Sequence, residues 1–184
     1  GKSGPGIADN QYQSGRTLYI SDSVSRRNAG NGIYLYNSWD TATLTITADI
    51  RDTLIADNLA NGLSFHRANV TLDRCTIRGN SSSATAGGVS MGIGKHDFRN
   101  CLISRNTASS FCGAIYKWSA EGYLNLYQCT IVSNLSLSGG PGGLRSSATN
   151  PVVNTILRYN YLNTSIDDLY TFGGTRVSNS CIAS

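Results

Sequence analysis

The stretch "RCTIRGN" at residues 74–80 recurs as "NCLISRN" at 100–106 and as "QCTIVSN" at 128–134. Each copy places a cysteine, an apolar residue and a final asparagine at the same positions. Aligning the final asparagine extends the series to six members: Asn28, Asn58, Asn80, Asn106, Asn134 and Asn160. The steps between consecutive members are 30, 22, 26, 28 and 26 residues. A spacing of this size is typical of one coil of a solenoid. The frame therefore predicts a repeat protein.

Two further series run in phase with the asparagines. The first is an apolar residue that follows a small or glycine-rich pair, and its members are Ile7, Ile33, Leu63, Val89, Ile115 and Leu144. The second is a short apolar segment ahead of each frame, such as Val70 with Leu72 or Leu124 with Leu126. Each period therefore holds three short strands. Strands this short become stable when each one pairs with its counterpart one coil away.

These series predict an all-β fold, a right-handed parallel β-helix of about seven coils, each of roughly 26 residues with three short strands. The alternative is a β-sandwich, but sandwich strands do not repeat one sequence frame in register. We expect residues 1–184 to form a single β-helix domain, with both ends cut within a coil or completed by neighbouring subunits.

Composition narrows the possible partners. Charged residues make up 14% of the 184 residues and hydrophobic residues 40%, and no apolar run approaches the ~18 residues that span a bilayer. The net charge is +4, and the arginines are scattered along the sequence instead of forming a block. We therefore expect no membrane span and no nucleic-acid partner.

Alternation within the frame predicts which side chains face the core. The apolar column is Ile55, Ile77, Ile103, Ile131 and Leu157. Two positions earlier lies a column of small residues, which is Ser23, Thr53, Cys75, Cys101, Cys129, Thr155 and Cys181. The cysteines are interpreted as compact core fillers. Disulfides stay possible, with Cys101 and Cys129, or Cys112 and a neighbour, as candidates.

We predict neither a metal site nor a cofactor, because the sequence has no CxxC pair and no Cys/His cluster with zinc spacing. The asparagine column, including Asn80, Asn106 and Asn134, has a structural interpretation. Asparagine tolerates left-handed geometry at a tight corner, and stacked side-chain amides can bond to one another along a ladder.

The outward positions after the glycine corner carry aromatic residues. We predict a ligand or partner face formed by Tyr34, Tyr36, His66, Tyr116, Trp118 and Arg145. Aromatic rings beside hydrogen-bonding groups suit a cell-surface glycan or a protein partner. Packing between neighbouring coils explains the same residues equally well.

A catalytic site is harder to find. A glycosidase needs two carboxylates on one face, and the acidic residues form no such column. The tightest polar cluster is Lys95, His96 and Asp97, in a loop-like stretch before Phe98. It is a weak catalytic candidate, with a solvated turn as the other interpretation, so enzymatic activity is left open.

Two features predict association with other molecules. An outward, largely apolar strip is expected at Val24, Leu54, Thr76, Leu102, Thr130, Ile156 and Ile182, and exposed apolar strips usually mark interfaces. In addition, an open solenoid end presents unpaired strand edges. We therefore expect self-association through the open ends, which would propagate head to tail as a filament.

The frames quoted above alternate with "AGGVSM", "CGAIY" and "PGGLRS". Together they resemble the right-handed β-helix repeats of bacterial surface proteins, and they are similar in style to the repeats of polymorphic membrane proteins. The closing stretch "NTILRYNYLNTSIDDLYTFGGTRVSNSCIAS" resembles the last coils of choice-of-anchor β-helix proteins.

This resemblance implies an extracellular or cell-surface protein with a structural or adhesive role. The alternative it leaves is a carbohydrate-binding or carbohydrate-active β-helix, similar to the polysaccharide lyases or glycosidases.

Overall fold

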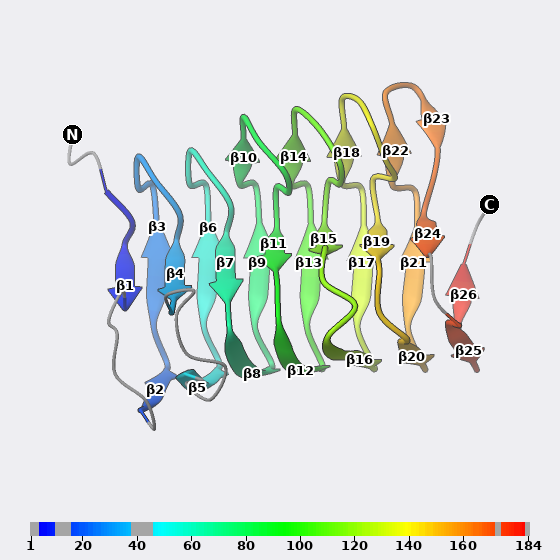
Figure 1. Cartoon of the computed structure of the whole chain (residues 1–184). Helices are drawn as coiled ribbons and strands as arrows, with labels where there is room; N and C mark the ends of the chain where they lie inside the picture. Colours follow the sequence, from blue (N-terminus) through cyan, green and yellow to red (C-terminus); the bar gives the residue numbers. More distant parts are fainter. Residues whose placement is uncertain (1–3, 10–15, 38–45, 172–173, 183–184) are drawn as a thin grey trace.

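The computed structural model describes residues 4–9, 16–37, 46–171 and 174–182, and the regular structure within these ranges is entirely β-strand (Figure 1). The strands form four sheets, here named A to D. Sheet A contains β1 (Ile7–Asp9), β4 (Ile33–Tyr36), β7 (Leu63–His66), β11 (Val89–Met91), β15 (Ile115–Lys117), β19 (Leu144–Ser146) and β24 (Leu169–Thr171). Sheet B contains β2 (Thr17–Ser21), β5 (Ile46–Arg51), β8 (Ala68–Asp73), β12 (Gly94–Arg99), β16 (Gly122–Tyr127), β20 (Pro151–Val153) and β25 (Arg176–Ser178).

Sheet C follows sheet B in each coil, and sheet D follows sheet C in four of the coils. Sheet C contains β3 (Val24–Arg26), β6 (Leu54–Ala56), β9 (Thr76–Arg78), β13 (Leu102–Ser104), β17 (Thr130–Val132), β21 (Ile156–Arg158) and β26 (Cys181–Ile182). Sheet D contains β10 (Ser81–Ser82), β14 (Thr107–Ala108), β18 (Leu135–Ser136), β22 (Tyr161–Leu162) and β23 (Ser165–Ile166).

Sheets A, B and C are parallel, and each strand pairs with its counterparts in the coils before and after it. Sheet C, for example, aligns Ile55 with Ile77, Ile103 and Ile131 in register. Seven strands in each of these sheets make a parallel β-solenoid of about six turns. The predicted fold and its spacing of about 26 residues are confirmed. Among the described residues, no helix is long and apolar enough to cross a bilayer.

The fourth sheet is not predicted by the three apolar series of the sequence. Four residues lie between Asn58 and Leu63, whereas eight lie between Asn80 and Val89. The longer connections have room for an additional two-residue strand, so sheet D first appears with β10. It ends in an antiparallel pair, in which β23 folds back onto β22.

Left-handed backbone forms two corners of each frame. One lies at the residue before the small inward residue, where φ is 52° at Arg74 and 55° at Asn100. The other lies at the residue before the asparagine, where φ is 65° at Gly79 and 56° at Arg105. The expectation that the ladder asparagines themselves adopt left-handed geometry is therefore wrong. The preceding residue makes the turn, which leaves the asparagine side chain to bridge between coils.

The asparagines form a continuous amide ladder. Asn80 donates from Nδ2 to Oδ1 of Asn106 over 2.9 Å, and Asn106 donates in the same way to Asn134 over 3.0 Å. The backbone N–H of Asn80 donates to the same Oδ1 of Asn106 over 3.1 Å. The last amide, Nδ2 of Asn160, donates to the buried carboxylate of Asp168 over 2.7 Å. The predicted structural role of Asn80, Asn106 and Asn134 agrees with this geometry.

The small inward residues also make a specific bond. Their hydroxyl or thiol donates to the carbonyl two residues earlier, at 2.7 Å from Thr53 to Arg51 and at 3.1 Å from Cys101 to Arg99. In the last coil this role belongs to Ser180, whose Oγ lies 2.8 Å from the carbonyl of Ser178.

Placing Cys181 in the inward column is therefore wrong. Cys181 pairs with Ile156, so it takes the outward position expected for Ile182, and Ile182 pairs with the buried Leu157. The outward strip accordingly ends at Cys181.

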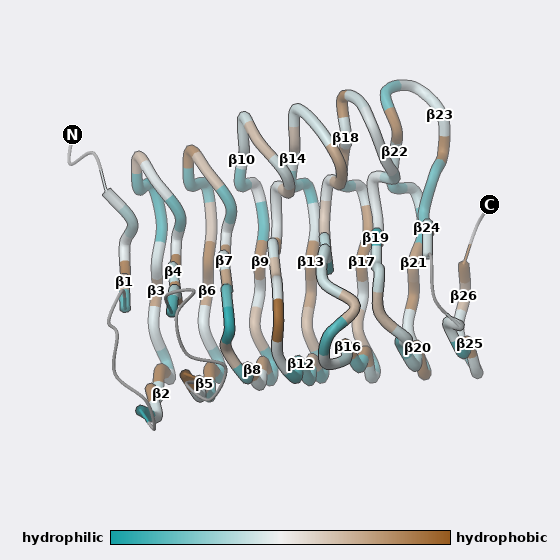
Figure 2. The backbone as a smooth tube through the Cα atoms, viewed as in Figure 1, coloured by the Kyte–Doolittle hydropathy of each residue, from teal (hydrophilic) through white to brown (hydrophobic). Residues whose placement is uncertain are grey.

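Buried apolar residues fill the space between the sheets. Figure 2 shows that hydrophobic residues are spread along the whole length of the solenoid. Cys75, Cys101 and Cys129 are buried in the core. All five cysteines are free, which answers the open question of disulfides. Burial raises the pKa of the Cys112 thiol to about 12, so this thiol stays protonated at neutral pH.

Candidate functional site

The outward face of sheet A carries a row of stacked rings, here called the aromatic ladder: Tyr34, Tyr36, His66 and Trp118. The ring centroids of Tyr34 and Tyr36 lie 6.0 Å apart at an interplanar angle of 10°. Those of Tyr36 and His66 lie 5.1 Å apart at 20°. His66 and Trp118 follow at 5.4 Å and 13°. The structure thus brings four of the six predicted face residues into one row.

Gly92 makes the ladder continuous. Trp118 comes two coils after His66, because β7 pairs with β11 and β11 pairs with β15. Strands two steps apart are ~9.6 Å apart, so Trp118 must lean back across β11 to reach His66. A Cβ atom at Gly92 would lie 2.3 Å from Cζ2 of Trp118. The absence of a side chain at this position is what admits the indole ring.

The offset of the rings decides whether the ladder can hold a ligand. Parallel rings in contact are separated by ~3.5 Å along their normal, so centroids 5.1 and 5.4 Å apart imply a sideways shift of roughly 4 Å. The rings are therefore stacked in a parallel, laterally displaced arrangement, and part of each ring face is not covered by the next ring. The Trp118 side chain is 39% exposed. Packing between coils and ligand binding are therefore compatible on this face.

The other two predicted residues form a separate arginine–aromatic cluster. Tyr116 stacks on Phe111 with centroids 5.4 Å apart at 6°. The Arg145 guanidinium lies 5.2 Å from the Phe111 ring centroid and 5.6 Å from those of Tyr116 and Tyr170. Arg145 and Tyr170 also line a cavity of about 270 Å³ together with Asp167. Burial, with the neighbouring Asp168, raises the pKa of the Asp167 carboxyl.

The weak catalytic candidate does not form a cluster of side chains that face one another. Lys95, His96 and Asp97 lie on strand β12, not in a loop-like stretch, and strand alternation sends His96 into the core while Lys95 and Asp97 point outward. Asp97 accepts a hydrogen bond from Asn125 over 2.7 Å. The expectation of a solvated turn is wrong for His96, which is completely buried. Three adjacent residues on a strand cannot converge on one substrate.

A buried lysine, which the repeat pattern did not predict, lies beneath the ladder. Lys117 occupies the inward column of Phe65 and Met91, and its Nζ donates to the carbonyls of Gly92 and of Glu121, the latter over 2.8 Å. Burial lowers its pKa to about 8. Burial, with the nearby positive charge of Lys117, lowers the pKa of His96 to about 3. The signal that could have revealed it is that Lys117 follows Leu35, Phe65 and Met91 in one inward column.

Lys117 thus ties together the two segments that place Trp118. Lys117 directly precedes Trp118 in the chain. Its Nζ donates a hydrogen bond to the carbonyl of Gly92, and the indole ring lies where a side chain of residue 92 would begin. It is a positioning residue for the ladder, because its ammonium group is buried and cannot touch a ligand.

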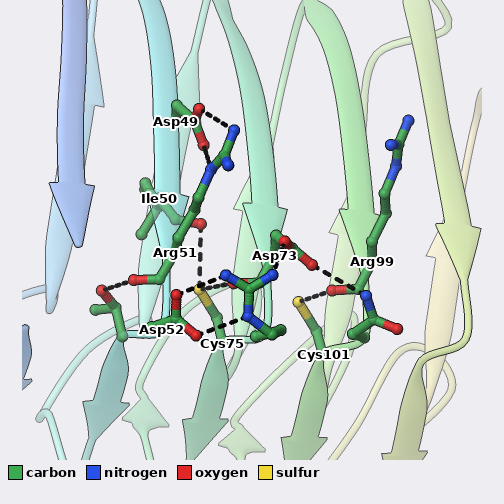
Figure 3. Close-up of polar contacts among 11 residues, drawn as sticks. Asp49, Ile50, Arg51, Asp52, Asp73, Cys75, Arg99 and Cys101 are labelled. Carbon is green, nitrogen blue, oxygen red and sulfur yellow. Dashed lines mark hydrogen bonds and ion pairs between the residues drawn. The ribbon is translucent and has the colours of Figure 1, made fainter. Parts of the chain in front are cut away.

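A charged cluster occupies the corner between sheets B and C (Figure 3). Arg51 donates to Asp49 over 2.7 Å, and Arg74 donates to Asp52 over 2.7 Å and also to Asp73. The hydrogen bond from Arg51 lowers the pKa of Asp49, and the hydrogen bond from Arg74 lowers that of Asp52. These carboxylates are neutralised by their arginines, so the cluster is a structural network. In the described ranges, no group of three or more metal-ligating side chains occurs.

Comparison with known proteins gives no match to a family model, to a curated protein or to a solved structure.

Proposed function

We propose that this protein is an extracellular structural or adhesive β-solenoid that acts by binding, and that its aromatic ladder holds a glycan. The observation that carries the proposal is the ring row from Tyr34 to Trp118, completed across Gly92. The row departs from the regular stacking of side chains, because the Trp118 ring leans back by one coil and lies over Gly92. The in-register neighbours of Trp118 are Gly92 and Ser147, which carry no ring, so the stack on His66 depends on the space at Gly92.

The ladder suits an extended sugar chain. Sugar rings have apolar C–H faces that stack on aromatic rings, and the tyrosine hydroxyls and the imidazole add hydrogen-bonding groups beside them. His66 contributes a ring whose Nδ1 lies 3.1 Å from the carbonyl of Asn37, which fixes the orientation of the imidazole. Stacked strands also hold the rings on a rigid base, so little ordering entropy is lost on binding.

The alternative is a carbohydrate-active enzyme. The geometry of Lys95, His96 and Asp97 supplies no observation in its favour. Release of reducing or unsaturated sugars from a polysaccharide panel tests it, and Lys95→Ala and Asp97→Ala would then show whether these residues matter. Assembly into head-to-tail filaments stays a prediction, which electron micrographs of the purified protein would test.

The binding experiment compares variants on a panel of immobilised polysaccharides. We expect the wild type to bind at least one neutral glycan. Trp118→Ala should weaken that binding about tenfold, since one lost aromatic stack with its buried area amounts to roughly 1.4 kcal/mol. Gly92→Ala should act in the same direction, because the new methyl group displaces the indole ring.

The matched control is Tyr19→Ala, which removes an aromatic side chain that is 76% exposed on sheet B, away from the ladder. This variant should bind like the wild type. Equal losses in Trp118→Ala and Tyr19→Ala, or no binding of any neutral glycan by the wild type, would refute the proposal.

A further inference from the structure

A second surface of the molecule carries an excess of cations, with one acidic residue among them, Asp57 at the corner that follows sheet C. Five arginines lie on the outward side of sheet C or at the corner that follows it: Arg26, Arg27, Arg78, Arg105 and Arg158. We call them the arginine stripe. They are far apart in the sequence, and the coil period brings them onto one face.

Strand register sets their arrangement. The third position of each sheet C strand forms one column. Its order along the solenoid is Arg26, Ala56, Arg78, Ser104, Val132 and Arg158. Arg27 and Arg105 stand one residue later, at the left-handed corner. Arg26 and Arg158 are five coils apart, which is roughly 24 Å along the solenoid. The stripe is therefore straight, and small side chains leave room between its charges.

The charges of the stripe differ from those at the other corner of the same sheet. There Arg51 and Arg74 are bonded to carboxylates. In the part of the chain that the structure describes, Arg26, Arg27, Arg78 and Arg105 are exposed and form no ion pair. Arg158 lies over the Tyr159 ring at 4.9 Å. One face of the solenoid is thus left cationic while the neighbouring corner is neutralised.

We propose that the arginine stripe binds a linear anionic polysaccharide, on a surface separate from the aromatic ladder. A row of guanidinium groups matches carboxylates or sulfates repeated along a chain, because each group can donate two parallel hydrogen bonds to one such anion. The column beside the arginines contains Leu54, Thr76 and Leu102, which give a flat, uncharged floor.

Other occupants fit this face less well. A single-stranded nucleic acid needs a series of aromatic rings on which successive bases stack. The described sheet C strands carry no ring on their outward side, and the described corner that follows them carries one, Tyr159. A second copy of the same face would oppose arginine with arginine. A membrane surface favours several large aromatic side chains at the interface, whereas the described part of this face offers one, Tyr159.

The experiment measures affinity for dextran sulfate and for dextran, two polymers that share one backbone and differ in charge. We expect the wild-type protein to bind dextran sulfate and not dextran through this stripe, and we expect added salt to weaken the binding because the arginines are exposed. The variant Arg78→Gln/Arg105→Gln should bind dextran sulfate about tenfold more weakly, since it loses two charged contacts.

The matched control is Lys95→Gln/Arg176→Gln. It removes the same amount of charge from exposed positions on sheet B. This variant should keep the wild-type affinity. Equal losses in the two double variants would show that only net charge matters and would overturn the proposal. Equal or tighter binding of single-stranded DNA or of anionic lipid vesicles would overturn the choice of a polysaccharide.

Trp118→Ala separates this proposal from the function assigned to the ladder. That variant should bind dextran sulfate like the wild type, because Trp118 lies on the outward side of sheet A and the stripe lies on sheet C. Loss of dextran sulfate binding in Trp118→Ala would show that one surface serves both ligands, against the proposal of two.

Discussion

Replacing Asn106 by alanine should cost much more stability than replacing an asparagine on the outer face. The side chain of Asn106 is completely buried and takes part in four hydrogen bonds. It accepts from the backbone N–H and the Nδ2 of Asn80, and it donates to the carbonyl of Ile77 and to Oδ1 of Asn134, over 2.9 to 3.1 Å.

The magnitude follows from what the substitution leaves behind. Nδ2 of Asn80 keeps a second acceptor, the carbonyl of Ile55, over 3.2 Å. Oδ1 of Asn134 keeps the backbone N–H of Asn106 over 3.0 Å. The backbone N–H of Asn80 loses its acceptor inside the core. One orphaned buried donor and three further lost bonds together predict a destabilisation of about 3 to 5 kcal/mol.

Equilibrium urea unfolding followed by circular dichroism measures this difference. The control is Asn125→Ala, which removes a single bond from a half-buried side chain to Asp97 on the outer face, and it should cost about 1 kcal/mol or less. Because solenoids can unfold in parts, the slope of the transition must be compared as well as its midpoint. A loss below 1 kcal/mol in Asn106→Ala would refute the reasoning that the amide ladder holds the coils together.

Two further predictions concern buried groups. Because the pKa of Lys117 falls from 10.5 to about 8 on folding, the unfolded chain binds more protons between these values, so the unfolding free energy should rise with pH across that window. Urea titrations at several pH values measure this rise, and in Lys117→Met the unfolding free energy should lack the contribution of Lys117 to it. An identical dependence of the unfolding free energy on pH in the two proteins would contradict the assignment of this rise to Lys117. Thiol labelling of the native protein should modify Cys181 alone, since it is exposed and the other four cysteines are buried; labelling in urea should modify all five. Rapid labelling of a second native thiol would show that the core is less closed than described.

The repeat made the fold predictable because each frame encodes the same stacking. The asparagine that recurs every 22 to 30 residues is the one that bridges coils, and Ile77, Ile103 and Ile131 align as the alternation requires. Where the frame degenerates, the prediction failed. In "SNSCIAS" Cys181 was aligned with the inward cysteines of the earlier frames. The left-handed backbone at Asn179 instead places Ser180 at the inward position.

Features that depend on contact between distant coils could not be found in this way. A strand and a loop look alike around Lys95 to Asp97 until their pairing with β8 and β16 is known. The arginines are scattered along the sequence, yet Arg26, Arg78 and Arg158 share one column. The alternation did predict an aromatic face, but the reach of Trp118 across Gly92 depends on side-chain packing.

The central claim is that the aromatic ladder is a binding surface, and fluorescence of Trp118 tests it most directly. The chain has two tryptophans, so Trp39→Phe leaves Trp118 as the sole indole emitter. Titration with a neutral glycan selected from the panel should shift its emission in a saturable manner, and the Tyr36→Ala variant should need more ligand to saturate. A glycan that binds while the Trp118 emission stays unchanged would contradict the claim.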